Sequence, residues 1–239
     1  MKILNSILDL IYPNRCWGCD RLLPEKSVGF CTLCQQTVLE QTDCCAQCGV
    51  PIENIGAQTI PRCGPCQYKP TSALQSCWWA LEYGGAIQHA IQKMKFGQQW
   101  PLATEFSRLF QPHPQQDHLY LEWDAVIAVP MHWRTRMDRG FNQSTVLARA
   151  IASRLHIPLL IGSLKKNRHT ARQTTLSAKQ RRTNLSGAFS IHKPQSIEGK
   201  RLLLIDDVVT TGTTIQACAK TLKAANARTI DAWSLCRKL

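Results

Sequence analysis

The spacing of hydrophobic residues changes at about residue 72. Beyond that point, short apolar or aromatic runs alternate with segments of helical spacing, which is typical of a mostly parallel sheet flanked by helices. The runs expected to form strands are 77–83, 125–129, 157–161, 202–205 and 229–235. The segments expected to form helices are 84–96, a stretch that begins at Pro101, 142–155 and 213–225. The pattern therefore predicts an α/β domain over residues 71–239.

Two of these runs, 125–129 and 202–205, are apolar at every position, as expected of parallel strands covered on both faces. Ligands of such sheets bind at the carboxyl ends of the strands, so polar residues directly after these runs are candidate site residues. Residues 111–116 carry two prolines and are expected to form a loop. Residues 163–184 are polar, basic and poor in large apolar groups, and we expect them to be mobile.

Residues 1–70 follow a different pattern, which is set by cysteine. Nine of the chain's 12 cysteines lie between positions 16 and 66, and eight of them form four pairs with a two-residue spacer. The paired residues are Cys16, Cys19, Cys31, Cys34, Cys45, Cys48, Cys63 and Cys66. Such a spacer lets a tight turn aim two thiolates at one metal, and two turns complete the tetrahedral four-sulfur site that zinc favours. We therefore predict a double zinc-ribbon module with two structural zinc ions.

Other uses of these cysteines fit less well. Disulfides require an oxidising compartment, and a thioredoxin-like redox pair would occur once beside a βαβ pattern. An iron–sulfur cluster matches the regular spacing poorly. Sequential pairing, in which the first two pairs bind one zinc and the last two bind the other, is simplest, and interleaved pairing stays open. Cys44 duplicates Cys45 and is expected to be a bystander.

The net charge of +13 lies entirely in residues 71–239, because residues 1–70 hold six basic and six acidic residues. Residues 139–197 contain no carboxylate at all, so this stretch builds a positive field that attracts phosphates or nucleic acid. A solvated surface is the ordinary alternative. Trp133 and Phe141 lie within the basic region and are candidates either for stacking bases or for the core.

No apolar run is long enough to cross a bilayer. Residues 1–11 join a lysine to apolar residues, but Asn5, Ser6 and Asp9 interrupt the run and no small-residue cleavage site follows. We expect a short amphipathic helix here rather than an export signal. The expected location is the cytoplasm, without stable membrane insertion.

The sequence LLLIDDVVTTGTT at 202–214 carries the most specific chemistry. Its buried run ends in Asp206 and Asp207, which can accept hydrogen bonds from the vicinal diol of a ribose. A loop then leads into a helix, whose N-terminus favours a phosphate. The hydroxyls of Thr210, Thr211, Thr213 and Thr214 add donors, and Gly212 permits close approach. A Walker loop is excluded because it needs a lysine after its last glycine, and a dinucleotide fingerprint needs more glycines.

Residues 202–214 resemble the phosphoribosyl-pyrophosphate motif of type I phosphoribosyltransferases. Further segments resemble the ComF/ComFC family of competence protein F-like and GntX-like proteins: Tyr12-Pro13, Lys95-Phe96, Val129-Pro130, Arg139-Gly140-Phe141-Asn142-Gln143, Gln173, Arg181, Asn184 and Ala188-Phe189. One departure is Ala225-Asn226-Ala227, where the family often has glycine. Asn226 can adopt the left-handed conformation that a helix end requires, so we expect the fold to be kept.

The resemblance implies that Asp206 and Asp207 contact the ribose, that Thr210, Thr211, Gly212, Thr213 and Thr214 cradle the 5-phosphate, and that the turn after Val129 faces pyrophosphate. The ligand would be magnesium-bound phosphoribosyl pyrophosphate. Arg139 is a candidate for stabilising the leaving group, because we place it in the turn after the second strand. A lid is expected from Arg172, Gln173, Arg181 and Arg182.

Two functions follow from this resemblance. One is phosphoribosyl transfer, with Asp206, Asp207 and Arg139 as catalytic residues and an unidentified acceptor. The other is a non-catalytic regulatory or nucleic-acid-binding protein that keeps the pocket as a sensor, because fold does not imply function. The family is linked to DNA uptake in natural transformation. Single-stranded DNA and proteins of the uptake machinery are therefore expected partners.

Overall fold

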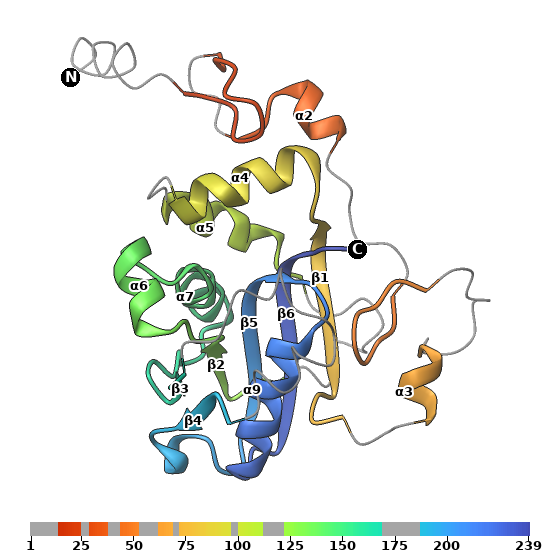
Figure 1. The fold of residues 1–239 in the computed structure, drawn as a ribbon, viewed down its shortest axis with the longest axis vertical. Coiled ribbons are helices and arrows are strands. Elements are labelled where there is room, and N and C mark those ends of the chain that lie inside the picture. Colours follow the sequence, from red (N-terminus) through yellow and green to blue (C-terminus); the bar gives the residue numbers. More distant parts are fainter. Residues whose placement is uncertain are drawn as a thin grey trace.

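A four-stranded parallel sheet forms the centre of the computed structural model of this chain, with the strand order β1-β6-β5-β2 (Figure 1). The strands are β1 (Ser76–Glu82), β2 (Ala125–Ala128), β5 (Arg201–Val209) and β6 (Thr229–Arg237). The structure describes residues 14–24, 29–37, 44–52, 62–68, 72–96, 100–111, 122–168 and 187–239. The predicted mostly parallel sheet is therefore confirmed.

Each face of the sheet is covered by its own layer. Helices α4 (Gly85–Phe96), α5 (Trp100–Phe106) and α7 (Gln143–Leu155) pack on one face, and α9 (Thr213–Ala224) packs on the other beside a hairpin of β3 (Leu164–Lys166) and β4 (Phe189–Ile191). The centre of β5 shows why both layers form. Leu203 and Ile205 belong to the first core, Leu202 and Leu204 belong to the second, and all four are fully buried.

Shorter elements complete the fold, and the first two of them lie within the N-terminal module. They are α2 (Thr32–Gln36), α3 (Gly64–Tyr68), the 3-10 turns η1 (Ser107–Leu109) and η4 (Pro194–Ser196), and α6 (Trp133–Arg139). Helix α6 is absent from the sequence prediction. No described helix is long and apolar enough to cross a membrane. Asn226, which follows the C-cap of α9, has a φ of 62°, so its expected left-handed conformation is confirmed.

Three of the predicted boundaries were wrong. The expected strand at 157–161 is a single bridge from Leu159 to Val126, because Pro158 has no N–H to donate and Gly162 turns the chain at a φ of 76°. Strand β5 continues past residue 205 through both aspartates, because its pairing with β6 extends to Val209. Residues 164–166, expected to be mobile, form β3, and residues 169–184 lie outside the described part, as do residues 1–11 and 112–116.

The N-terminal module packs directly on the sheet domain in two places. Around Gly18 the chain lies so close to α4 that an added Cβ would stand 2.6 Å from the Cβ of Ala86. Around Gly49, an added Cβ would stand 2.8 Å from the carbonyl oxygen of Cys77 in β1, and Trp79 Nε1 donates to the carbonyl of Gly49 at 2.8 Å. Both cysteine-rich parts therefore rest on elements of the α/β domain.

Candidate functional site

The first four cysteines form one metal-ligand set. The Sγ atoms of Cys16, Cys19, Cys31 and Cys34 all lie within 4.8 Å of one another, and those of Cys19 and Cys31 are 3.7 Å apart. A tetrahedron with Zn–S bonds of about 2.3 Å has an edge of about 3.8 Å. The spacing of the sulfurs therefore fits a structural zinc ion with no open coordination position.

The hydrogen bonds around Cys16 favour its thiolate form. Burial alone raises the pKa of this thiol, but backbone N–H groups, among them those of Cys31 and Gly18, donate to its Sγ and lower the pKa to about 6. A thiolate is the form that binds metal. The fold therefore favours the form of Cys16 that binds zinc.

Cys45, Cys48, Cys63 and Cys66 form the second set with the same geometry, including a distance of 3.7 Å between the sulfurs of Cys48 and Cys63. A hydrogen bond from Cys48 lowers the pKa of Cys45 to about 4. The pairing is therefore sequential, which resolves the alternative left open by the sequence. Cys44 is buried beside this set but is not part of it.

The paired carboxylates lie near the carboxyl end of β5, inside the strand. Ser144 Oγ of α7 donates to Asp206 Oδ1 at 3.0 Å, and the N–H of Asp207 donates to the same oxygen at 2.9 Å. Lys95, the penultimate residue of α4, places its Nζ 2.8 Å from Asp207 Oδ2. Sequence analysis missed Lys95 and Ser144 as site residues, although Lys95-Phe96 was noted as a segment shared with the family.

The two aspartates have opposite electrostatic environments. Burial and the charge of Asp207 raise the pKa of Asp206 to about 8. Burial also acts to raise the pKa of Asp207, but the ammonium of Lys95 outweighs it and lowers this pKa. These opposite shifts favour the protonated form of Asp206 and the ionised form of Asp207. Neighbouring carboxyl groups whose pKa values are pushed apart in this way are a frequent feature of functional sites.

The threonine loop follows the carboxylates at the same end of the sheet. Thr210 and Thr211 are exposed, and the hydroxyls of Thr211 and Thr213 are 2.7 Å apart. Helix α9 begins at Thr213 with Gly212 as its N-cap, at a φ of 73°, and this cap has no side-chain hydrogen bond. The predicted combination of hydroxyls, one left-handed glycine and a helix N-terminus is thus present at the surface.

Arg139 is the last residue of α6, not part of a turn after β2 as expected, because residues 133–139 wind into a helix. Its guanidinium carbon lies 5.1 Å from the ring centroid of Phe96, the residue after Lys95. Burial acts to lower the pKa of Lys95, but the ion pair with Asp207 outweighs both burial and the smaller opposing effect of Arg139, so this pKa is raised. The structure thus places Arg139 beside the end of α4 that carries Lys95. The turn after Val129 is held beside β5, since the N–H of Val129 donates to the carbonyl of Ile205 at 2.8 Å. Arg172, Gln173, Arg181 and Arg182 lie outside the described residues.

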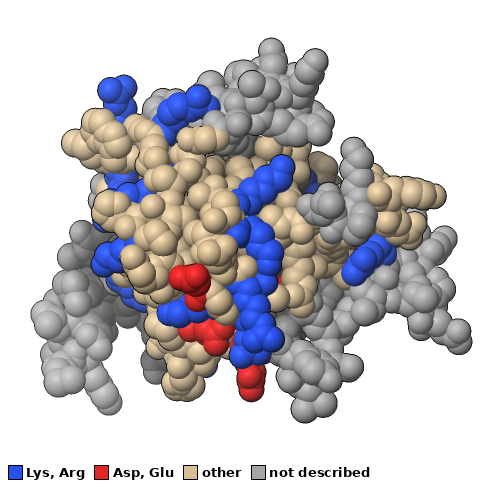
Figure 2. Space-filling model, turned by 90° about the horizontal axis from the view of Figure 1, so that it is seen from below, with Lys and Arg blue, Asp and Glu red and all other residues tan. Residues whose placement is uncertain are grey.

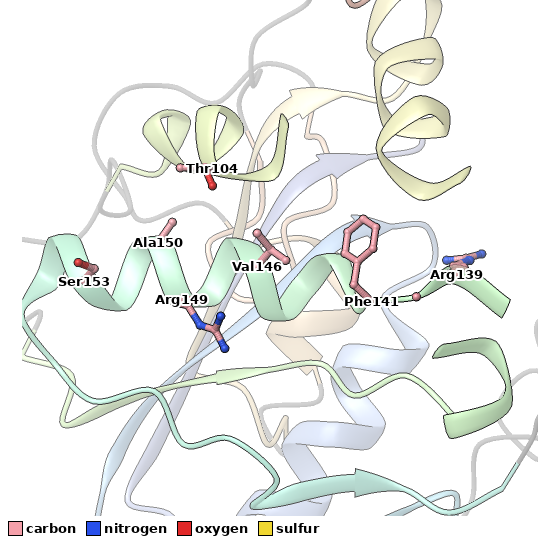
Figure 3. A pocket seen from close by; sticks show the side chains of 8 residues that line it. Thr104, Arg139, Phe141, Val146, Arg149, Ala150 and Ser153 are labelled. Carbon is pink, nitrogen blue, oxygen red and sulfur yellow. The ribbon is translucent and has the colours of Figure 1, made fainter. Parts of the chain in front are cut away.

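Two cavities lie on either side of α7. One, of about 640 Å³, lies between α5 and α7, where Val146 and Ala150 point toward Thr104 (Figure 3). The other, of about 710 Å³, lies among α6, α7 and β3. Arg149 lines both cavities and points away from Thr104. Neither cavity is lined by the 206–214 segment, whose threonines lie open at the end of the sheet.

Comparison with known proteins agrees with this architecture. The phosphoribosyl transferase domain family matches residues 142–239, and the double zinc ribbon domain family matches residues 7–67. The chain is 33% identical over 233 residues to the DNA utilization protein YhgH of Escherichia coli O157:H7, which covers 96% of this chain and 100% of that protein.

Two further relatives carry competence in their names. Competence protein F of Haemophilus influenzae is 29% identical over 231 residues, covering 93% of this chain and 96% of that protein. Competence protein ComFC of Streptococcus pneumoniae is 26% identical over 232 residues, covering 87% of this chain and 99% of that protein.

Two cysteine tetrads and a parallel sheet that ends in an acidic pair and a threonine loop define a double zinc ribbon joined to a phosphoribosyltransferase-type domain. The chain belongs to the ComF family, the family of the DNA utilization protein YhgH and competence protein F.

Proposed function

We propose that the end of β5 and the start of α9 bind magnesium-bound phosphoribosyl pyrophosphate. The observation that carries this proposal is the placement, on one strand–loop–helix unit, of two carboxyl groups and of a helix N-terminus capped only by glycine. Thr210, Thr211, Gly212, Thr213 and Thr214 would hold the 5-phosphate, because N–H groups, hydroxyls and the helix dipole all favour an anion there.

The two carboxyl groups would have different roles in binding the ribose and the metal. Ionised Asp207 accepts hydrogen bonds from the ribose hydroxyls and offers the hard oxygen that Mg²⁺ prefers, directly or through water. Protonated Asp206 can donate one hydrogen bond as well as accept. Lys95 supplies a positive charge beside them, which compensates the negative charge of buried Asp207.

The reaction class is transfer of the phosphoribosyl group. Pyrophosphate leaves from the anomeric carbon, and a nucleophile attacks the same carbon. Arg139, which lies beside Phe96 at the end of α4, would stabilise the charge that develops on the leaving group. Arg172, Gln173, Arg181 and Arg182 would close over the ligand. The second candidate is a sensor with the same pocket and no turnover. Pyrophosphate release in the presence of magnesium and an acceptor distinguishes transfer from binding alone.

The names of the relatives support a role with DNA. YhgH is named for DNA utilization, and the relatives from Haemophilus influenzae and Streptococcus pneumoniae are named for competence. We place the DNA contact in residues 71–239, which carry the whole positive excess, and we infer single-stranded DNA and uptake proteins as partners. Cysteines arranged as metal ligands fit a reducing compartment, so we infer that the protein is located in the cytoplasm.

The binding proposal is tested by replacing Asp207. Asp207→Asn removes the charge that holds the diol and the metal, so affinity for magnesium-bound phosphoribosyl pyrophosphate should fall about 10- to 100-fold. Isothermal calorimetry measures the affinity. Glu198→Gln, an exposed carboxylate near the amino ends of the strands, is the matched control and should bind like wild type. Equal affinity of the Asp207 variant and wild type would show that the ribose lies elsewhere.

A further inference from the structure

The cavity among α6, α7 and β3 belongs to no function described so far. It lies at the outer edge of β2, and Pro130 and Met131 of the loop after β2 form part of its wall. It thus lies next to the turn proposed to face pyrophosphate. Much of its lining is aliphatic, and the remainder includes aromatic rings, four cationic residues, and the asparagines Asn142 and Asn167.

The cations are Arg136, Arg149, Lys165 and Lys166. Within the described residues, no carboxylate lies within ion-pair distance of any of the four. Lys166 is in addition partly buried, and burial lowers its pKa. Its Nζ lies 5.9 Å from the ring centroid of Phe189 in β4. The charge of Asp206 acts on Lys166 from beyond ion-pair distance. Four cations around one cavity, none with a described carboxylate within ion-pair distance, favour an anion such as a phosphate.

The face at the amino ends of the strands provides a contrast. A run of Lys and Arg side chains crosses this face, with Asp and Glu side chains beside it (Figure 2). Arg201, at the start of β5, lies 3.0 Å from Glu122 and 3.6 Å from Asp124. Part of the positive charge there is therefore already compensated. The cavity is the better-suited anion site, because its cations have no such partners among the described residues.

The aromatic component is Trp133 at the start of α6. Its side chain is 58% exposed, which is high for a residue type that is usually buried. Arg134 approaches its ring at 5.3 Å and His132 at 5.7 Å, so the indole is supported by neighbours while it stays open to solvent. Phe141 and the exposed Ile161 add apolar surface to the same cavity. An indole held in this way at the rim of a cationic cavity suits the planar base of a nucleotide.

We propose that this cavity binds a nucleotide, with the base stacked on Trp133 and the phosphate held by Arg149, Lys165 and Lys166. The nucleotide is either free or one unit of a single strand, and the chemistry that recognises it is the same in both cases. The proposal that a nucleotide binds here depends only on the residues of the cavity. Its meaning as the acceptor side of phosphoribosyl transfer rests on the proposed function, because the two sites adjoin at the loop after β2.

The experiment uses the full-length zinc-loaded protein and fluorescence anisotropy of a fluorescein-labelled oligothymidylate of about 12 nucleotides, within the usual site size of a single-strand-binding groove. Trp133→Ala should weaken binding about 10-fold, in line with the loss of one base stack, and Trp133→Phe should largely restore it. Met137→Ala is the matched control, since Met137 is exposed one turn further along α6 and does not line the cavity. An abasic oligomer of equal length should bind wild type and Trp133→Ala alike.

The phosphate contacts are tested by salt dependence. Lys165→Gln with Lys166→Gln should weaken binding and reduce the slope of log affinity against log salt by about 1.4, as expected for two lost contacts to a single strand. The control is Lys220→Gln with Lys238→Gln, which removes the same charge from two exposed positions outside the cavity. This control should keep the wild-type slope.

The source of the nucleotide is decided by competition with thymidine monophosphate. Displacement of the oligomer from wild type but not from Trp133→Ala identifies a site for the free nucleotide, and binding of the oligomer alone identifies a strand. Wild-type affinity and salt slope in both cavity variants would overturn the proposal. Calorimetry with magnesium-bound phosphoribosyl pyrophosphate should be unchanged in these variants. If wild type did not bind magnesium-bound phosphoribosyl pyrophosphate, the proposed function would be refuted, but the evidence for nucleotide binding in the cavity would be unaffected.

Discussion

At the residue scale, the central feature is that two adjacent carboxyl groups have different charges. Asp206 is almost fully buried and receives two hydrogen bonds from neutral donors, whereas Asp207 contacts the Lys95 ammonium. Burial therefore dominates for Asp206 and raises its pKa, and the ion pair dominates for Asp207 and lowers its pKa. One residue becomes a donor and the other an anion, although both have the same side chain.

This arrangement has a cost in stability that can be measured. With a pKa of about 8 in the folded state and an ordinary value of 3.8, Asp206 binds more protons when folded, so its contribution to the free energy of unfolding falls as the pH rises from about 4 to 8. Asp206→Asn stays neutral and can still accept both hydrogen bonds. It should raise the Tm at pH 8 by about 2–4 °C, which corresponds to about 1 kcal/mol.

Thermal unfolding of both proteins at pH 5 and pH 8 checks this prediction. The difference in Tm should be smaller at pH 5, because little of the destabilising charge has formed there. A variant that is less stable than wild type at pH 8 would show that Asp206 is ionised in the folded protein.

The sequence predicted the cysteines and the acidic pair but not their neighbours. The cysteine pairs and the 202–214 segment are each formed by residues that are close together in the sequence, so a local pattern is enough to recognise them. Lys95 reaches Asp207, and Ser144 reaches Asp206, only after α4 and α7 have packed on the sheet. These contacts depend on tertiary packing, and no local pattern around either residue indicates them.

At the scale of elements, α4 connects two sites. Lys93 of α4 pairs with Asp20 and donates to the carbonyl of Cys16 at 3.3 Å, and Gly18 packs on Ala86 near the start of the helix. The other end of the same helix holds Asp207 through Lys95. The segment of the first cysteine tetrad (Cys16–Cys34) and the acidic pair therefore share one helix, whereas the segment of the second tetrad (Cys45–Cys66) contacts β1 and the carboxyl end of β6.

The shared helix predicts unequal effects of losing the two metals. Cys16→Ser should lower the affinity for magnesium-bound phosphoribosyl pyrophosphate about 5- to 10-fold, within the range of ordinary site-to-site coupling, and Cys63→Ser should lower it less. Asp20→Asn, which breaks the contact with Lys93 but keeps the cysteines, should give an intermediate loss. Calorimetry with metal analysis of each variant is the measurement. Equal losses in both cysteine variants would mean that α4 does not carry the coupling.

At the scale of the whole molecule, the ribbons brace the α/β domain. Trp79 of β1 and Arg237 of β6 both donate to backbone carbonyls in the segment of the second tetrad. Trp17, in the segment of the first tetrad, packs edge-on against Phe106 of α5. The division at residues 70 and 71 stays a prediction about independent folding units. These contacts could not be derived from the change in pattern at residue 72, because such a change marks a boundary in composition and says nothing of packing across it.

Zinc content tests the assembly as a whole. Protein purified without added metal should contain two zinc ions per chain, because each tetrad offers four sulfurs at tetrahedral spacing. Elemental analysis gives the ratio. A value near zero, or an absorption band of an iron–sulfur cluster, would contradict the assignment.

The ion pair between Lys95 and Asp207 has a consequence for the order in which ligands arrive. The carboxylate of Asp207 already has a counter-ion, the ammonium of Lys95, which is tethered to α4. A free magnesium ion must therefore compete with an ammonium group of fixed, high local concentration. A magnesium ion that enters on its pyrophosphate chelate brings new negative charge, and Lys95 can exchange one anionic partner for another without losing its compensation. On the proposed function, magnesium and phosphoribosyl pyrophosphate therefore bind together in one step. Lys95 disfavours the binding of magnesium that arrives without the pyrophosphate.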